Sequence, residues 1–145
     1  MIRLHKISFF ILFLILNQSF KSTDSKIDII FNSEKFTLTH SSSGCYHSLT
    51  RTYNFEKRLN DISVTDEYSQ KKDKNKRTGI KFQLTENELK GLKIIVINGA
   101  NHKKIGVCTT TEKFEISNGR FTVSFAIEDC QFDDFKNWIN KYENQ

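Results

Sequence analysis

The chain has 145 residues, a formal net charge of +5, and 27% charged residues. This length is enough for the core of one domain and too short for several. The basic excess is localised, because residues 1–20 contain two basic residues and no acid, and KKDKNKR at 71–77 contains five basic residues and one acid. The remainder is nearly neutral, which argues against a nucleic-acid-binding protein with a basic face.

The N-terminal segment has the pattern of a secretory signal peptide. Arg3 and Lys6 precede an almost entirely apolar run over residues 7–16, which is about half of the ~20 residues needed to span a bilayer. No small-x-small cleavage motif follows, so an N-terminal membrane anchor remains the alternative. We expect a signal peptide over 1–22, a single domain over 23–145, and export to the periplasm or the extracellular space. No transmembrane segment is expected after the signal is removed.

The first half of the mature chain predicts strands. KIDIIFNSEKFTLTH is interpreted as two strands around a turn at 32–34, because its second half alternates polar and apolar residues. SSSG at 41–44 interrupts this alternation, which resumes through Leu49, Arg51, Tyr53 and Phe55. DISVTDEY at 61–68 and GIKFQL at 79–84 predict two further strands. The polar segment between them, 69–78, is expected to form a mobile basic loop.

A helix is expected over residues 86–97. Thr85 and Glu88 in TENE have the spacing of a capping box, in which each side chain bonds the other residue's backbone N–H. Four apolar residues then share one helical face, namely Leu89, Leu92, Ile95 and Val96, and Asn98-Gly99 can end the helix. The β-branched run at 94–97 favours a strand instead, so a strand there is the alternative.

The segment at 108–128 predicts a β-hairpin. Asn118-Gly119 is a strong signal for a two-residue type I′ turn. That turn would pair Glu112 with Phe125, Phe114 with Val123, and Ile116 with Phe121. One face then carries the apolar residues Phe114, Ile116, Phe121, Val123, Phe125 and Ile127, and the other carries polar and charged residues.

A C-terminal helix is expected directly after this hairpin. QFDDFKNWINKY places Phe132, Phe135, Trp138, Ile139 and Tyr142 on one stripe. We expect this helix to pack on the apolar face of the hairpin. A disulfide between Cys108 and Cys130 would fasten the helix to the base of the hairpin and stabilise the fold by about 3 kcal/mol. Cys45–Cys108 is the rival pairing, because connectivity does not follow from sequence.

These elements predict an α+β fold with a single antiparallel sheet of five to seven strands and two helices. The layout SSGCYHS, CTTTEKFEI and EDCQFDDFKNW resembles small exported bacterial proteins of unknown function. Those proteins have a Gly-Cys-aromatic-His segment, a Cys-Thr-Thr strand, and a cysteine before an aromatic C-terminal helix. The resemblance implies export and the fold class, and it implies no catalytic residues.

HSSSGCYH contains the polar cluster His40, Cys45 and His47. Cys-x-His places two soft ligands on one side of a strand, and His40 could return across the turn as a third. A closed zinc site needs four ligands, and none of the established spacings is present, so we expect no metal and no cofactor. Cys45 could act as a nucleophile beside a histidine, but it opens a strand and not a helix. We therefore assign no catalytic residue.

The remaining functional candidate is the basic tract of Lys71, Lys72, Lys74, Lys76 and Arg77. It could bind an anionic partner, although a basic loop is often merely solvated. We expect a non-enzymatic exported domain that binds another protein or an anionic envelope component, with no specific nucleic acid. The alternative is a small secreted hydrolase, most plausibly a nuclease, in which His40 or His47 acts with Glu112 as general acid and base.

Overall fold

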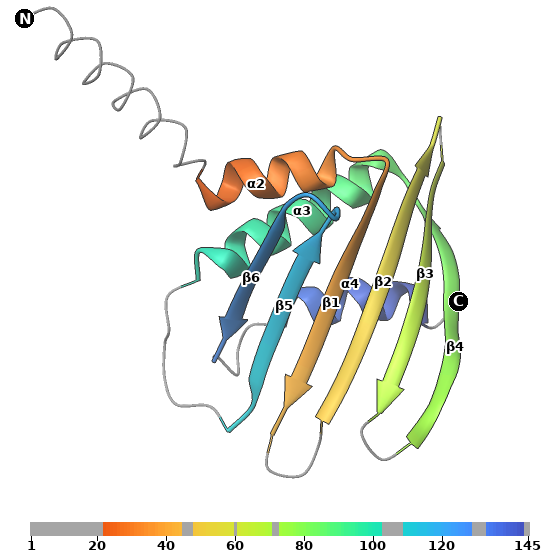
Figure 1. Ribbon diagram of the computed structural model, residues 1–145, viewed down its shortest axis with the longest axis vertical. Coiled ribbons are helices and arrows are strands. Elements are labelled where there is room, and N and C mark those ends of the chain that lie inside the picture. Colours follow the sequence, from red (N-terminus) through yellow and green to blue (C-terminus); the bar gives the residue numbers. More distant parts are fainter. Residues whose placement is uncertain are drawn as a thin grey trace, which may run out of the picture.

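The computed structural model describes residues 22–44, 48–59, 61–70, 73–102, 109–128 and 133–143, with backbone alone at 68–70, 73–78 and 143. One open antiparallel sheet has the strand order β4-β3-β2-β1-β5-β6 (Figure 1). The elements are α2 (Thr23–Phe31), β1 (Lys35–Ser43), β2 (Ser48–Arg58), β3 (Asp61–Gln70), β4 (Asp73–Leu84), α3 (Glu86–Ala100), β5 (Thr111–Ser117), β6 (Thr122–Ile127) and α4 (Asp134–Glu143). The α+β class and the antiparallel sheet predicted from the sequence are confirmed.

The sheet has one buried face and one polar face. Successive strand residues point to opposite faces, and the register aligns Phe36 with Phe55, and Leu38 with Tyr53 and Ile116. We call the face that carries these residues the inner face. The three described helices pack against it and form a single core with it, as shown by ring contacts such as Phe31 with Phe36 and Phe135 with Phe114.

Helix α2 corrects the strand that the sequence predicted for residues 26–31. The Ser22 side chain caps the helix by accepting a hydrogen bond from the Ser25 N–H, at 3.3 Å. Ile27, Ile30 and Phe31 are buried at spacings of three and four residues. A short apolar run fits both helix and strand periods, and here the N-cap and the burial against the sheet favour the helix.

Helix α3 confirms the predicted helix and its capping box. Thr85 Oγ1 accepts from the Glu88 N–H at 3.3 Å, and the Glu88 carboxylate accepts from the Thr85 N–H at 2.8 Å. The β-branched run at 94–97 stays helical because Leu92 and Val96 bury their side chains in the core. The predicted end at Asn98-Gly99 is too early, since the helix continues to Ala100 and Asn101 is its C-cap.

The β5–β6 hairpin has the predicted faces but a different register. Ser117 lies opposite Thr122 and Phe114 opposite Phe125, so the loop has four residues, 118–121, where two were predicted. Gly119 has the expected positive φ of 82°, and the Asn118 side chain accepts from two loop N–H groups. A shift of two residues preserves the face of every side chain, and the apolar residues accordingly remain on the inner face.

The basic loop predicted over 69–78 is mostly strand. Residues 69–70 end β3 and residues 73–78 begin β4, and Tyr68 lies opposite Arg77; residues 71 and 72 lie outside the described residues. Backbone pairing in a hairpin does not require apolar side chains, which is why composition alone misled the prediction. A bulge lies further along β4, where Gly79 and Ile80 oppose the single residue Asp66.

The C-terminal helix α4 has the predicted apolar stripe, with Phe135, Trp138, Ile139 and Tyr142 buried; Phe132 lies outside the described residues. The helix covers more than the predicted hairpin. Figure 1 shows it crossing behind the middle of the sheet, where Phe135 contacts Tyr53 of β2 and Tyr142 stacks on Phe82 of β4. Cys108 and Cys130 lie outside the described residues, so their disulfide remains a prediction.

Gly79 at the bulge generates a test of the β3–β4 packing. A Cβ atom at Gly79 would lie 2.2 Å from the Asp66 carbonyl oxygen, whereas a Cβ at Gly91 in α3 meets no atom within 4 Å. We expect Gly79→Ala to lower the free energy of unfolding by about 1–3 kcal/mol. The matched control Gly91→Ala should raise it by about 0.5–1 kcal/mol. Urea denaturation measures both, and equal effects would contradict the close approach.

Candidate functional site

One end of the inner face is polar where a core would normally continue. Along β1 the inward residues pass from Phe36 and Leu38 to His40 and then Ser42, and the neighbouring strands show the same change. We call this group the inner polar cluster. It contains His40 and Ser42 of β1, Arg51 and Tyr53 of β2, Asp66 of β3, and Glu112 of β5.

The Glu112 carboxylate connects β5 to β1. Its Oε2 contacts His40 Nε2, and its Oε1 accepts a hydrogen bond from Ser42 Oγ at 2.8 Å. The His40 ring stacks on Phe114, with centroids 4.8 Å apart, and lies 5.1 Å from the ring of Phe135 in α4. The imidazole is thus held by two aromatic rings and one carboxylate.

This arrangement suits proton exchange better than nucleophilic attack. A serine nucleophile needs its hydroxyl proton directed at a base such as a histidine. The Ser42 hydroxyl instead donates its hydrogen bond to the Glu112 carboxylate. His40 and Glu112 are in contact, as a general acid and base acting together would be, and 15% of the histidine side chain and 26% of the glutamate side chain are exposed. A solute could therefore reach this pair.

The second half of the cluster is more deeply buried. Tyr53 and Asp66 face each other across β2 and β3, and they are 1% and 4% exposed. Tyr53 Oη and Asp66 Oδ1 make no hydrogen bond of ordinary geometry, although the Arg51 guanidinium lies close enough to Tyr53 to stabilise its ionised form. Burial raises the pKa of Tyr53 to about 12, and the Arg51 guanidinium partly opposes this. Burial also raises the pKa of Asp66, again against the attraction of Arg51.

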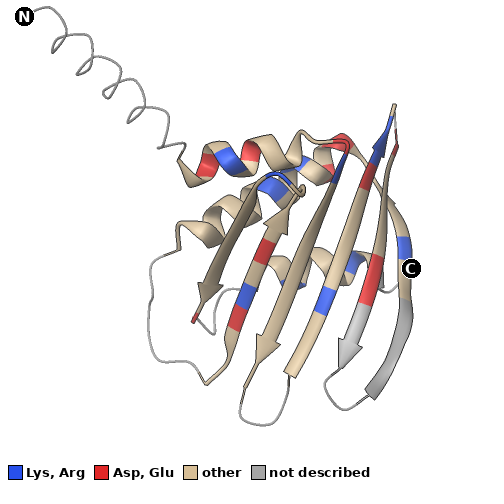
Figure 2. Ribbon diagram, in the orientation of Figure 1, with Lys and Arg blue, Asp and Glu red and all other residues tan. Residues whose placement is uncertain are grey.

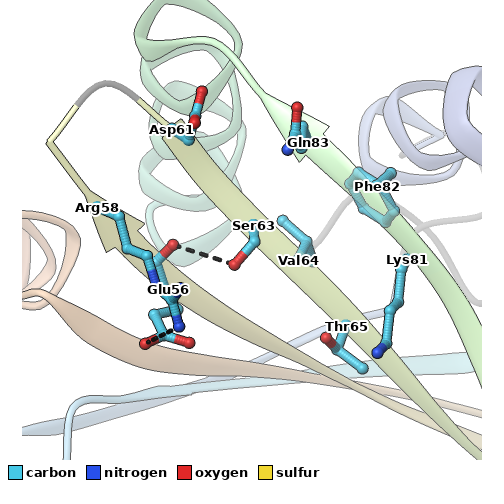
Figure 3. Close-up of a pocket in the computed structure, with 9 residues that line it drawn as sticks. All are labelled: Glu56, Arg58, Asp61, Ser63, Val64, Thr65, Lys81, Phe82 and Gln83. Atoms are coloured by element: carbon cyan, nitrogen blue, oxygen red, sulfur yellow. Dashed lines mark hydrogen bonds and ion pairs between the residues drawn. The ribbon is translucent and has the colours of Figure 1, made fainter.

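A groove of about 710 Å³ lies along β2, β3 and β4 near the β2–β3 turn (Figure 3). Its lining has both signs of charge, from Glu56, Asp61, Arg58 and Lys81. Glu56 is paired with Lys35 and Arg58, each at 3.2 Å, and these hydrogen bonds lower its pKa. The groove thus carries no single-sign field that would select an ion.

The structure describes some of the residues proposed from the sequence for a functional site, and others lie outside the described ranges. His40 joins Glu112, as the nuclease alternative required, although Glu112 lies opposite Ser42 and Ile127 and not opposite Phe125. Cys45, His47, Lys71, Lys72, Cys108 and Cys130 lie outside the described residues. The backbones of Lys74, Lys76 and Arg77 belong to β4. Within the described ranges, no group of three or more His, Cys, Asp or Glu residues could hold a metal ion.

Sequence reasoning did not single out Arg51, Tyr53 or Asp66 as site residues. The signal was present, because each continues an alternating strand at an inward position where an apolar residue is expected. Asp66 follows Ile62 and Val64 in the same inward row. A polar residue at an inward position is costly unless it is paired or functional, so such positions identify the cluster.

No protein-family model matches the chain, and no curated protein has a similar sequence. Among the described helices, none is long and apolar enough to cross a membrane.

Two tyrosines provide a test of the polar end of the inner face. Tyr53 Oη is buried beside the Arg51 guanidinium with no hydrogen bond of ordinary geometry, whereas Tyr142 Oη donates to Glu88 at 2.9 Å. Tyr53→Phe should leave the free energy of unfolding unchanged or raise it by about 1 kcal/mol, because it removes an unsatisfied group. Tyr142→Phe should lower it by roughly 0.5–1.5 kcal/mol. Thermal and urea unfolding check both signs, and a marked loss from Tyr53→Phe would mean that the hydroxyl is satisfied.

Proposed function

We propose that this chain is an exported, non-enzymatic binding domain for an anionic envelope component. The observation that carries the proposal is the division of the sheet into two faces. The three described helices all pack on the inner face. The opposite face, which we call the outer face, presents hydroxyl, amide and charged side chains from six strands. The outer face therefore offers a broad polar surface that the core does not use.

The basic tract at 71–77 adds net positive charge to the protein. Gln70 lies opposite Asp73, so the described part of the tract, the backbone of residues 73–77, begins the edge strand β4 at one end of the β3–β4 hairpin. Figure 2 shows acidic and basic residues interspersed over the described strands and helices. A tract with five basic residues and one acid next to a mixed surface supports attraction of an anionic partner to this end of the sheet.

The inner polar cluster argues against a serine hydrolase. The Ser42 proton is directed at a carboxylate and not at an imidazole, and Tyr53 and Asp66 are deeply buried. These groups therefore present no prepared nucleophile.

Neutralising the tract tests the proposal. Replacing Lys71, Lys72, Lys74, Lys76 and Arg77 with Gln should reduce binding to vesicles of phosphatidylglycerol and phosphatidylcholine by at least about tenfold, because each basic residue near an anionic surface contributes about 1 kcal/mol. Co-sedimentation measures this, with phosphatidylcholine vesicles as the uncharged comparison. Stability should change by less than about 0.5 kcal/mol.

The matched control replaces five lysines on the helices with Gln, at positions 26, 90, 93, 136 and 141. This variant has the same net charge and should retain most of the binding. If both variants lose vesicle binding equally, binding depends on the net charge of the protein alone, which would contradict a localised site. Retention by the tract variant would also reject the proposal, and selective capture of a protein would point to a protein partner.

A secreted nuclease is the second candidate, and the His40–Glu112 contact is the observation that favours it. General acid–base cleavage needs one group to take a proton and another to supply one. Purified protein would then cleave single-stranded nucleic acid. His40→Ala and Glu112→Gln would each lower the cleavage rate at least about 100-fold. Binding to anionic vesicles with no cleavage supports the first proposal.

A further inference from the structure

The two edges of the sheet differ in how they are protected against pairing with another strand. Edge strand β4 has a bulge at Gly79 and Ile80, and its sequence contains several basic residues. Bulges and lysines are common means of blocking edge-to-edge association. Strand β6 lies at the opposite edge of the sheet (Figure 1). Its sequence, TVSFAI, contains no charge, proline or glycine, and it pairs with β5 without a register shift. The β6 edge has none of these protections.

The hydrogen-bond pattern shows which β6 residues direct their backbone outward. The Asn118 N–H donates to the Phe121 carbonyl at 3.2 Å, so the backbones of these two loop residues face each other, as they do in a hydrogen-bonded pair of the ladder. Hydrogen-bonded and non-hydrogen-bonded pairs alternate along an antiparallel ladder. Thr122, Ser124 and Ala126 therefore direct their N–H and C=O groups away from β5.

We propose that β6 pairs antiparallel with β6 of a second copy of this chain, centred on Ser124, and joins the two sheets into one. Ser124 then lies opposite Ser124 of the partner subunit, and Thr122 lies opposite Ala126 of the partner subunit. On the inner face, Val123 lies opposite Phe125 of the partner subunit. Phe125 is half-buried in the single chain, and this pairing covers it with an apolar neighbour.

Charge complementarity favours a second copy in this orientation. Arg120 precedes β6 and is exposed, and Glu128 follows β6. Centring on Ser124 brings the β5–β6 turn that carries Arg120 towards Glu128 of the partner subunit, and the two-fold axis makes this approach twice. A parallel arrangement would place Arg120 beside its own copy and create repulsion. The strand therefore matches itself at its ends, on its outer face and on its inner face.

Sedimentation velocity of the exported protein tests the pairing. A six-residue strand pair is a small contact, and we expect a dimer that forms between about 1 and 100 µM. Ser124→Pro removes an outward N–H and leaves the ladder to β5 intact, so it should raise the dimer dissociation constant at least tenfold. Ser124→Val, the control, should keep the dimer. A monomer throughout the range, or no effect of Ser124→Pro, would overturn the proposal.

A charge exchange tests the register without relying on proline. Arg120→Glu alone and Glu128→Arg alone should each weaken the dimer several-fold, because each places like charges opposite one another. The double variant should restore it. Circular dichroism confirms that each variant is folded. A double variant that is weaker than both single variants would reject this register.

Discussion

The position of β1 in the middle of the sheet is the constraint on which the rest of the structure depends. β1 pairs with β2 on one side and with β5 on the other, so it joins the β1–β4 meander to the β5–β6 hairpin. Its inward residues Phe36 and Leu38 are buried and contribute to the core. The registers of β1 with β2 and of β1 with β5 determine which side chains of those strands face the core. A shift of either register by one residue would turn apolar side chains of the paired strand to the outer face.

The same strand explains why one face is apolar at one end and polar at the other. Phe36 stacks on Phe55 with ring centroids 4.4 Å apart, whereas His40 and Ser42 further along bind the Glu112 carboxylate. Helix α4 covers the transition, since Phe135 contacts both His40 and Tyr53. The apolar end stabilises the fold, and the polar groups lie at the other end of the inner face and on the outer face, the surface for which we propose a binding role.

The extent to which sequence predicted this structure depends on the range of the interactions involved. The Thr85–Glu88 capping box and the apolar stripe of α4 are local patterns, and both were predicted correctly. The faces of the β5–β6 hairpin were correct although its register was not, because an error of two residues leaves side-chain direction unchanged. Helix α2 was missed because burial of Ile27 and Ile30 against the sheet is a tertiary effect.

The candidate site was predicted in part for a related reason. His40 and Glu112 are 72 residues apart in sequence, and the proposed acid–base role named both without a means of placing them together. Their contact follows from the pairing of β1 with β5, which no local pattern encodes. Asp66 continues the inward row of Ile62 and Val64, but its burial beside Tyr53 follows only from the pairing of β2 with β3. Long-range strand pairing, and not residue chemistry, limited the prediction.

Native-state hydrogen exchange tests the central position of β1 most directly. If β1 joins the meander and the hairpin into one unit, amides at 35–43 should exchange only through global unfolding, together with those of β2 and β5. Amides of edge strand β4 and of α2 should exchange faster through local opening. Exchange of β1 at the rate of β4, or a clear separation between β2 and β5, would contradict the account, because the two halves would then unfold independently.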